Sequence, residues 1–162
     1  MLLSPTVDGV RVATVEDLHR ISVVAAAAFF WSPTFRFQRP HYKKFAQDTT
    51  ASYFREYEAA IRDPACVVLV TDDILDLRET EHVYEALRGV YGPQSPIKRA
   101  IVGVCSLNLK PESSYVGQFQ SPGQRARVIG GFEHGHDGDL KRDQCVEAVK
   151  VYSAVTGPVK AK

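Results

Sequence analysis

The chain has 162 residues, of which 44% are hydrophobic and 24% are charged, and its formal net charge is +1 at pH 7. This composition is typical of one globular domain with a sizeable core, and a charge so near zero gives no global attraction to nucleic acid or to an anionic membrane. No apolar run approaches membrane-spanning length, and the N-terminal sequence lacks the basic region and apolar run of a signal peptide. We therefore expect a cytoplasmic protein, with the nucleus as the alternative.

Three cysteines are present, an odd number that argues against a framework of disulfides. Cys66 and Cys105 both lie in apolar, strand-like runs, where a free thiol behaves as a small hydrophobic side chain. This use of cysteine favours a reducing compartment.

A short strand that leads directly into an amphipathic helix is predicted at the start of the chain. Residues Val10–Thr14 alternate about Arg11, and Thr14 followed by Asp17 is a near match to a capping box. The helix should cover Asp17–Phe29 and end at the Trp-Ser-Pro sequence that follows Phe30. The residues expected on its apolar face are Leu18, Ile21, Ala25 and Ala28. Such a pair is typical of an α/β or α+β layer.

The next stretch, residues 32–45, combines two prolines with four basic and four aromatic side chains. We expect a loop with one short helical turn. Basic side chains placed between aromatic ones can bind single-stranded nucleic acid by charge and stacking. The favoured interpretation is a partly buried loop whose aromatic side chains cap the core, because stacking platforms usually lie on an exposed sheet or groove.

Two helices and two strands are predicted for the middle of the chain. They are a helix over Gln47–Arg62, a strand over Cys66–Thr71, a helix over Ile74–Gly92 and a strand over Ala100–Lys110. Asp72 and Asp73 should close the first of these strands. We expect them to form a solvated turn rather than a metal site, because no second acidic cluster of defined spacing accompanies them.

Two motifs that suggest chemistry do not meet its requirements. Gly103 to Leu107 resembles a nucleophile elbow, but Leu107 replaces the second glycine, so Cys105 is not a nucleophile and no catalytic residue is assigned. The cluster of His134, His136 and Asp137 lacks the spacing of a known metal site, and we expect weak or no metal binding there.

The C-terminal part divides into a loop and a helix. Residues 111–139 have no hydrophobic periodicity and are rich in Gly, Ser, Gln and Pro, which predicts a long surface loop or a disordered segment. A helix should then cover Arg142–Ala154, with Asp143 as its cap and Gly157–Pro158 as its end. The expected organisation is therefore a folded part over residues 1–110, a variable loop over residues 111–139, and a helix with a tail over residues 140–162.

Four stretches resemble one enzyme superfamily. The opening VRVATVEDLHRI resembles the first strand and helix of the GCN5-related N-acetyltransferases, and AAAAFFWSPTFRFQRP is similar to the fungal branch of that superfamily. CVVLVTDD is similar to its second strand, and AIVGVCSLNLK to its third. The resemblance is most specific over Val10 to Phe45.

The resemblance implies an α+β fold of the acyl-CoA N-acyltransferase type, with a three-stranded antiparallel sheet and flanking helices. It also implies transfer of an acetyl group from acetyl-CoA to an amine acceptor, which is a small molecule or a peptide. By resemblance, the loop from Phe29 to Tyr42 lines the acceptor pocket. The residues expected to bind the acceptor, as walls and one charge, are Phe30, Trp31, Phe35 and Arg36. Core packing is the alternative role for each.

The cofactor motif of the superfamily is not matched. That motif is a Gln/Arg-x-x-Gly-x-Gly/Ala turn, whose backbone N–H groups and following helix meet the pyrophosphate of acetyl-CoA. The candidate here, Arg127–Gly131, is followed by Phe132 where a small residue is required, and no helical pattern follows. We therefore expect the N-terminal half of an acetyltransferase, truncated before the cofactor motif, inactive as written and unable to bind acetyl-CoA tightly.

Two further functions stay open. The first is a non-catalytic interaction module, because a sheet that lacks its fourth strand exposes an edge that recruits a partner protein or a second copy. The second, less favoured, is nucleic-acid binding through Arg36 to Lys44, which would weaken steeply with added salt.

Overall fold

The computed structural model describes residues 8–91, 99–120 and 141–160. Its strands are β1 (Val10–Val12), β2 (Cys66–Ile74) and β3 (Arg99–Asn108). Its helices are α1 (Leu18–Phe29), α2 (Pro33–Gln38), α3 (Ala46–Arg62), α4 (Glu85–Arg88) and α5 (Val146–Lys160). The predicted α+β class is confirmed, and none of the described helices has the length and apolarity needed to cross a bilayer.

The three strands form one antiparallel sheet, as predicted, and their order in it is β1-β2-β3. Leu69 of the central strand β2 lies opposite Val12 of β1 and opposite Cys105 of β3. Each expected strand is therefore present in this sheet.

Strand β2 is longer than predicted. Its register with β3 shifts between Thr71 and Asp72, and pairing then continues to Ile74, which lies opposite Arg99. The prediction that Asp72 and Asp73 close the strand is therefore wrong. Asp72 can stay in the ladder because Arg11 of β1 donates to its carboxylate at 2.7 Å, so the carboxylate has a counter-charge on the neighbouring strand.

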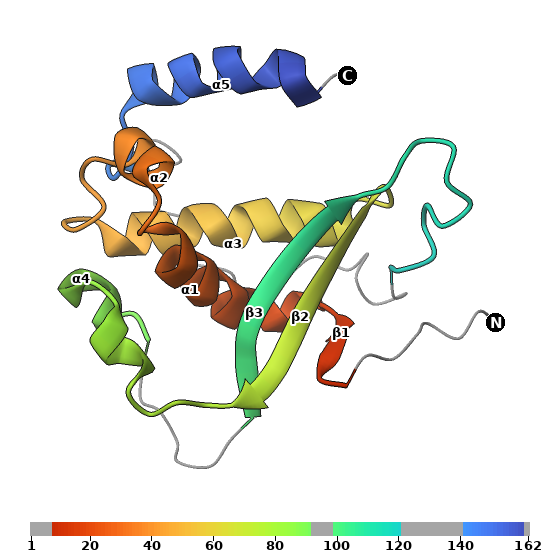
Figure 1. Ribbon diagram of the computed structural model, residues 1–162, viewed down its shortest axis with the longest axis horizontal. Helices are drawn as coiled ribbons and strands as arrows, with labels where there is room; N and C mark the ends of the chain where they lie inside the picture. The colour runs from red at the N-terminus through yellow and green to blue at the C-terminus, as the bar shows by residue number, and fades with distance from the viewer. Residues whose placement is uncertain (1–7, 92–98, 121–140, 161–162) are drawn as a thin grey trace.

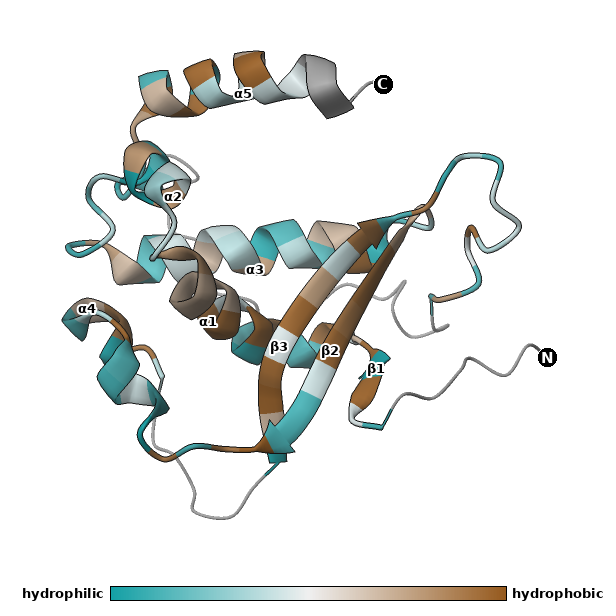
Figure 2. Ribbon diagram, in the orientation of Figure 1, coloured by the Kyte–Doolittle hydropathy of each residue, from teal (hydrophilic) through white to brown (hydrophobic). Residues whose placement is uncertain are grey.

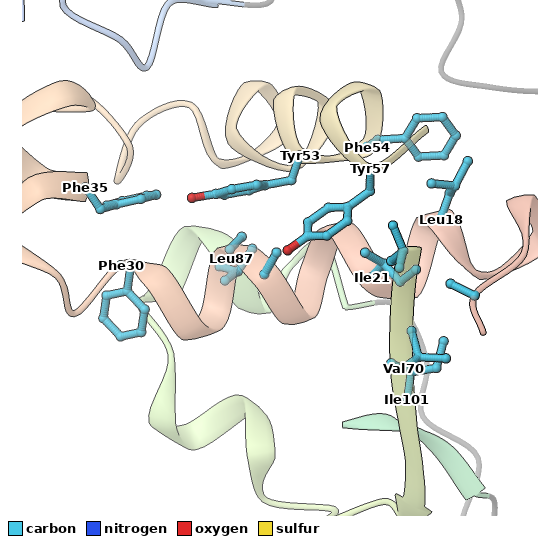
Figure 3. Close-up of a cluster of buried hydrophobic side chains, with 14 of the residues drawn as sticks. Leu18, Ile21, Phe30, Phe35, Tyr53, Phe54, Tyr57, Val70, Leu87 and Ile101 are labelled. Atoms are coloured by element: carbon cyan, nitrogen blue, oxygen red, sulfur yellow. The ribbon is translucent and has the colours of Figure 1, made fainter. Parts of the chain in front are cut away.

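Helices α1 and α3 cover one face of the sheet (Figure 1). Ile21 of α1, Val70 of β2 and Ile101 of β3 are almost fully buried and form one group in Figure 3. The predicted stripe of α1 is confirmed for three residues, but Ala28 is exposed. The stripe continues instead in four-residue steps from Leu18, which lead to Ser22, Ala26 and Phe30, all buried.

The predicted helix between β2 and β3 is largely absent. The first residues of that stretch belong to β2, and a 3₁₀ turn (Glu79–His82) and the one-turn helix α4 follow. Asp76 accepts a hydrogen bond from the backbone N–H of Arg78 at 2.8 Å, and this local bond competes with helix formation. Val83 and Leu87 are nevertheless buried. The apolar pattern therefore predicts the burial of these two residues correctly but the conformation of the stretch wrongly.

Helix α5 begins later than predicted and continues further. Asp143, the expected cap, is fully buried instead. The helix also passes through Gly157 to Lys160, although Gly157–Pro158 was the predicted end. Glycine has no Cβ, so a glycine before a proline avoids part of the steric clash that usually ends a helix there. Figure 1 shows α5 beyond α2, away from the sheet.

The second face of the sheet carries the residues that alternate with the buried ones. Leu69 is half-buried there, and Leu107 of β3 is 48% exposed. Cys105 is also exposed, so the expectation that it packs like the buried Cys66 is wrong. The described helices that pack on the sheet, α1 and α3, lie on the opposite face. Figure 2 shows apolar residues along both β2 and β3, and in the described part of the chain β3 has a neighbouring strand on one side only.

Candidate functional site

The four predicted acceptor residues lie at the end of α1 and in α2. Phe30 and Phe35 are buried in the core, with 6% and 5% of their surface exposed, whereas Trp31 is 63% exposed. The rings of Phe30 and Trp31 are 4.5 Å apart, and Arg36 donates from Nε to the carbonyl oxygen of Phe30 at 3.0 Å. The fold thus gathers three of them into one contacting group, with Phe35 turned inward. Their role in acceptor binding stays a prediction.

Two tyrosines connect Phe30 to Phe35. The ring of Tyr84 lies 5.3 Å from Phe30 and 4.8 Å from Tyr42, and Tyr42 lies 5.3 Å from Phe35. These ring distances are typical of favourable aromatic pairs. The sequence does not indicate Tyr84 as a site residue, because Tyr84 lies within the stretch Ile74–Gly92, which is predicted to be one helix.

A surface depression of about 570 Å³ adjoins this aromatic group. It is lined by Lys43, Tyr84, Glu85 and Ala86. An aromatic side chain between a cation and a carboxylate offers apolar contact and both signs of charge to a ligand. Because Tyr84 contacts Phe30, the depression lies beside the predicted acceptor residues.

A buried polar cluster surrounds Asp143. The Asp143 carboxylate is fully buried, and its Oδ2 accepts from Nη1 of Arg39 and, at 2.8 Å, from the hydroxyl of Thr49. Arg39 also donates from Nη2 to Ser52 at 2.8 Å, and its guanidinium lies 5.3 Å from the centre of the Tyr53 ring. A buried ion pair of this kind needs such further hydrogen bonds to offset desolvation.

A second ion pair fixes the same C-terminal segment. Arg142 donates from Nη2 to Oδ1 of the buried Asp48 at 2.8 Å, and its backbone N–H donates to Oδ2 of Asp48 at 3.0 Å. The backbone N–H of Cys145 donates to the carbonyl oxygen of Gln38 at 2.8 Å. Residues 141–145 are thereby tied to α2 and α3. No local pattern in the sequence could indicate pairs between residues so far apart along the chain.

One polar atom of this region, Oδ1 of Asp143, is buried without a hydrogen-bond partner, and the hydroxyl of Tyr84 is buried as well. Burial raises the pKa of Tyr84 to about 12, whereas a hydrogen bond with the Thr49 side chain opposes this rise and the nearby Asp143 charge adds to it. Tyr84 therefore keeps its proton at neutral pH and can act as a hydrogen-bond donor.

The basic stretch from Arg36 to Lys44 does not form a continuous nucleic-acid surface. Arg39 is buried in its ion pair, and the rings of Phe35 and Tyr42 are buried as well. Stacking on a nucleic acid needs accessible ring faces. The favoured interpretation, in which aromatic side chains of this stretch cap the core, agrees with this burial.

Two predicted motifs lie outside the described residues. They are the Arg127–Gly131 turn and the His134, His136 and Asp137 cluster. Within residues 8–91, 99–120 and 141–160, the His, Cys, Asp and Glu side chains form no group of three that could hold a metal ion.

Comparison with known proteins gives one informative similarity. The chain is 25% identical over 152 residues to a protein named "Acetyltransferase" from Stachybotrys chartarum (strain CBS 109288 / IBT 7711). The match covers 94% of this chain and 54% of that protein, so the chain spans about half the length of this relative. This similarity supports an acetyltransferase relationship. No family model matches the chain, and no solved structure does.

An acetyltransferase needs a site for the pyrophosphate of acetyl-CoA, and helix N-termini are the usual place for one. Each of the three longer described helices has a carboxylate at its start. Asp17 precedes α1, Asp48 lies in the first turn of α3, and Glu147 lies in the first turn of α5. A carboxylate there competes with phosphate for the positive end of the helix dipole, although Arg11 pairs with Asp17 and Arg142 pairs with Asp48.

Proposed function

We propose that the chain is an N-acetyltransferase-like protein that contributes the acceptor side of acetyl transfer from acetyl-CoA to an amine. The observation that carries the proposal is the similarity to the Stachybotrys chartarum protein named "Acetyltransferase", which extends over 94% of this chain. The sequence resemblance of the first strand and helix to GCN5-related N-acetyltransferases supports the same assignment. The acceptor is a small molecule or a peptide, and the protein acts in the cytoplasm.

The aromatic group at the end of α1 supports an amine acceptor. The ring of the exposed Trp31 lies tilted against that of the buried Phe30, and Tyr84 extends this apolar surface to the depression that Lys43 and Glu85 border. Aromatic faces attract ammonium groups and pack against hydrocarbon, and the Glu85 carboxylate adds a charge of the required sign. The acceptor is held here while its amine reaches outward to the thioester.

We expect that this chain alone binds acetyl-CoA no more tightly than about millimolar strength. The reason is that the sequence does not match the superfamily's Gln/Arg-x-x-Gly-x-Gly/Ala turn, whose backbone N–H groups meet the pyrophosphate. Lysine side chains such as Lys43 and Lys44 attract the nucleotide only weakly. Isothermal titration with acetyl-CoA checks this, and the residual heat should diminish further as salt is added.

Saturable one-to-one binding in the micromolar range contradicts this expectation. In that case the first variant to make is Gly130→Trp, because residues 127–131 are the sequence candidate for a phosphate-binding turn. Loss of binding in that variant, with an unchanged melting temperature, would place the cofactor site in that turn.

A second candidate function is a non-catalytic interaction module. The observation that favours it is the exposed side of β3, which has one neighbouring strand among the described residues and carries the exposed side chains of Val102 and Leu107. Unpaired strand edges recruit further strands. This function predicts concentration-dependent association in sedimentation velocity that a Leu107→Lys substitution abolishes, whereas the acceptor site predicts amine binding by the monomer.

A further inference from the structure

Two surface depressions adjoin each other beside α4. The first has a volume of about 570 Å³ and is lined by Lys43, Tyr84, Glu85 and Ala86. The second has a volume of about 300 Å³, and its lining includes Lys44, Phe45, Ala86, Val90 and Arg142. Ala86 lines both depressions, and Lys43 of the first directly precedes Lys44 of the second. A ligand that occupies the first depression can therefore extend into the second.

The second depression contains a cation that no described carboxylate neutralises. Lys44 is exposed, and it forms no ion pair within residues 8–91, 99–120 and 141–160. Its ammonium nitrogen lies 5.1 Å from the centre of the Phe45 ring, and the guanidinium carbon of Arg142 lies 4.8 Å from the same centre. A ligand group beside this ring therefore lies near two cations.

Asp48 also lines the second depression, but it does not neutralise Lys44. The Asp48 side chain is 1% exposed, and its two oxygens accept from Arg142 at 2.8 Å and 3.0 Å. Asp48 and Arg142 balance each other, which leaves the charge of Lys44. One carboxylate from a ligand would match that charge. Side chains would hold it, because the start of α3 already has the carboxylate of Asp48.

The first depression contains the opposite unpaired charge. Glu85 is exposed, and its carboxylate forms no ion pair with a cation of the described residues. A ligand that carries only an amine would meet Glu85 but would leave Lys44 unmatched. A ligand with an ammonium at one end and a carboxylate at the other meets a counter-charge in each depression.

We propose that Lys44, assisted by Arg142, binds a carboxylate of the same acceptor whose amine lies at Glu85. This proposal rests on the proposed function for the amine end of the ligand. The acceptor class is therefore a zwitterion, in which a short hydrocarbon chain joins an amine to a carboxylate. Phe45, Ala86 and Val90 offer apolar contact to that chain.

The test compares three ligands with the same carbon chain. They are 6-aminohexanoate, which carries both charges, hexylamine, which carries only the ammonium, and hexanoate, which carries only the carboxylate. Backbone amide spectra of the isotopically labelled protein are recorded while each ligand is added. We expect 6-aminohexanoate to shift the amides of Lys44, Phe45, Glu85 and Ala86 saturably. It should bind about fivefold or more tightly than either ligand of single charge, because both contacts form within one molecule.

Lys44→Gln isolates the carboxylate contact, because it removes the charge and keeps a polar side chain. It should weaken the binding of 6-aminohexanoate and hexanoate by about fivefold and leave that of hexylamine unchanged. Lys44→Arg keeps the charge and should keep the binding. Lys44 is exposed, so we expect both variants to fold, which circular dichroism verifies.

The matched control is Lys110→Gln, which makes the same change at an exposed lysine that follows β3. Leu109 beside it is bonded to Ala65, beyond the end of α3, whereas Lys44 precedes the start of that helix. The control should bind all three ligands like the parent.

Three results would overturn the proposal. They are equal binding of 6-aminohexanoate and hexylamine, equal binding of 6-aminohexanoate by Lys44→Gln and the parent, or no shift of the Lys44 and Phe45 amides with either carboxylate. If hexylamine still shifts Glu85 and Ala86 in any of these cases, the proposed function stands without the carboxylate site. Saturable binding of hexanoate that Lys44→Gln weakens, with no response to hexylamine, would keep the carboxylate site and refute the proposed function.

Discussion

An Ile21→Asp variant is expected to be unfolded at 25 °C. Ile21 is fully buried in α1, where it packs with Val70 and Ile101 of the sheet (Figure 3). The substitution removes apolar burial and places a carboxylate without a counter-charge in the core, and the two effects together reach about 5 kcal/mol or more. Single domains are stable by only about 5–15 kcal/mol. Far-UV circular dichroism and a thermal melt check the result.

Ile74→Asp provides the matched control for Ile21→Asp. The chemical change is identical, but Ile74 lies at the end of β2 with 74% of its surface exposed. The control should therefore melt within a few degrees of the parent, since exposed substitutions change stability by about 0.5 kcal/mol or less. A melting curve of Ile21→Asp that matched that of the control would show that the core is wrongly assigned.

The second large effect is expected for Arg39→Met. Methionine preserves much of the apolar volume beside Phe35 and Tyr53, but it removes the counter-charge of the fully buried Asp143. Breaking a buried ion pair on one side leaves the other charge uncompensated and costs about 3–5 kcal/mol. The free energy of unfolding, measured by urea denaturation, should fall by about that amount.

Two comparisons isolate the charge effect at Arg39. Arg78→Met makes the same change at an exposed position and should leave the free energy of unfolding nearly unaltered. The double variant Arg39→Met with Asp143→Leu removes both charges and should recover part of the loss. If Arg39→Met were as stable as Arg78→Met, the Arg39–Asp143 pair would not anchor residues 141–145.

The parts of the fold that could be predicted are those that local periodicity specifies. Strand β3 and helix α3 lie close to their predicted bounds because strand alternation and helical spacing act within a few residues. The stretch between β2 and β3 could not be predicted in the same way. Its apolar residues Val83 and Leu87 recur at helical spacing, but Asp76 forms a local turn and the ladder with β3 extends to Ile74.

The candidate site was harder to predict than the fold. Phe30 and Trp31 could be proposed from the sequence because they lie in one recognisable stretch. Tyr84 and Asp143 could not, because they come from distant parts of the chain and meet only through tertiary contacts with Thr49 and Arg39. Asp143 also carries a misleading local signal, since an acidic residue before a helical pattern is an ordinary cap.

The central claim, that an amine acceptor binds beside the end of α1, can be tested directly with intrinsic fluorescence. The chain contains a single tryptophan, and that residue, Trp31, is 63% exposed in the predicted acceptor loop. Its emission therefore reports on this loop alone. A lysine-containing peptide, a simple alkyl amine and the N-acetylated form of each are titrated into the protein.

The account predicts a saturable change in Trp31 emission with the free amines, and a clearly weaker response with their N-acetylated forms. The reason is that acetylation removes the ammonium that the aromatic rings and Glu85 attract. A response that is absent for all of the amines, or equal for each amine and its acetylated form, would contradict the assignment of this loop to the acceptor.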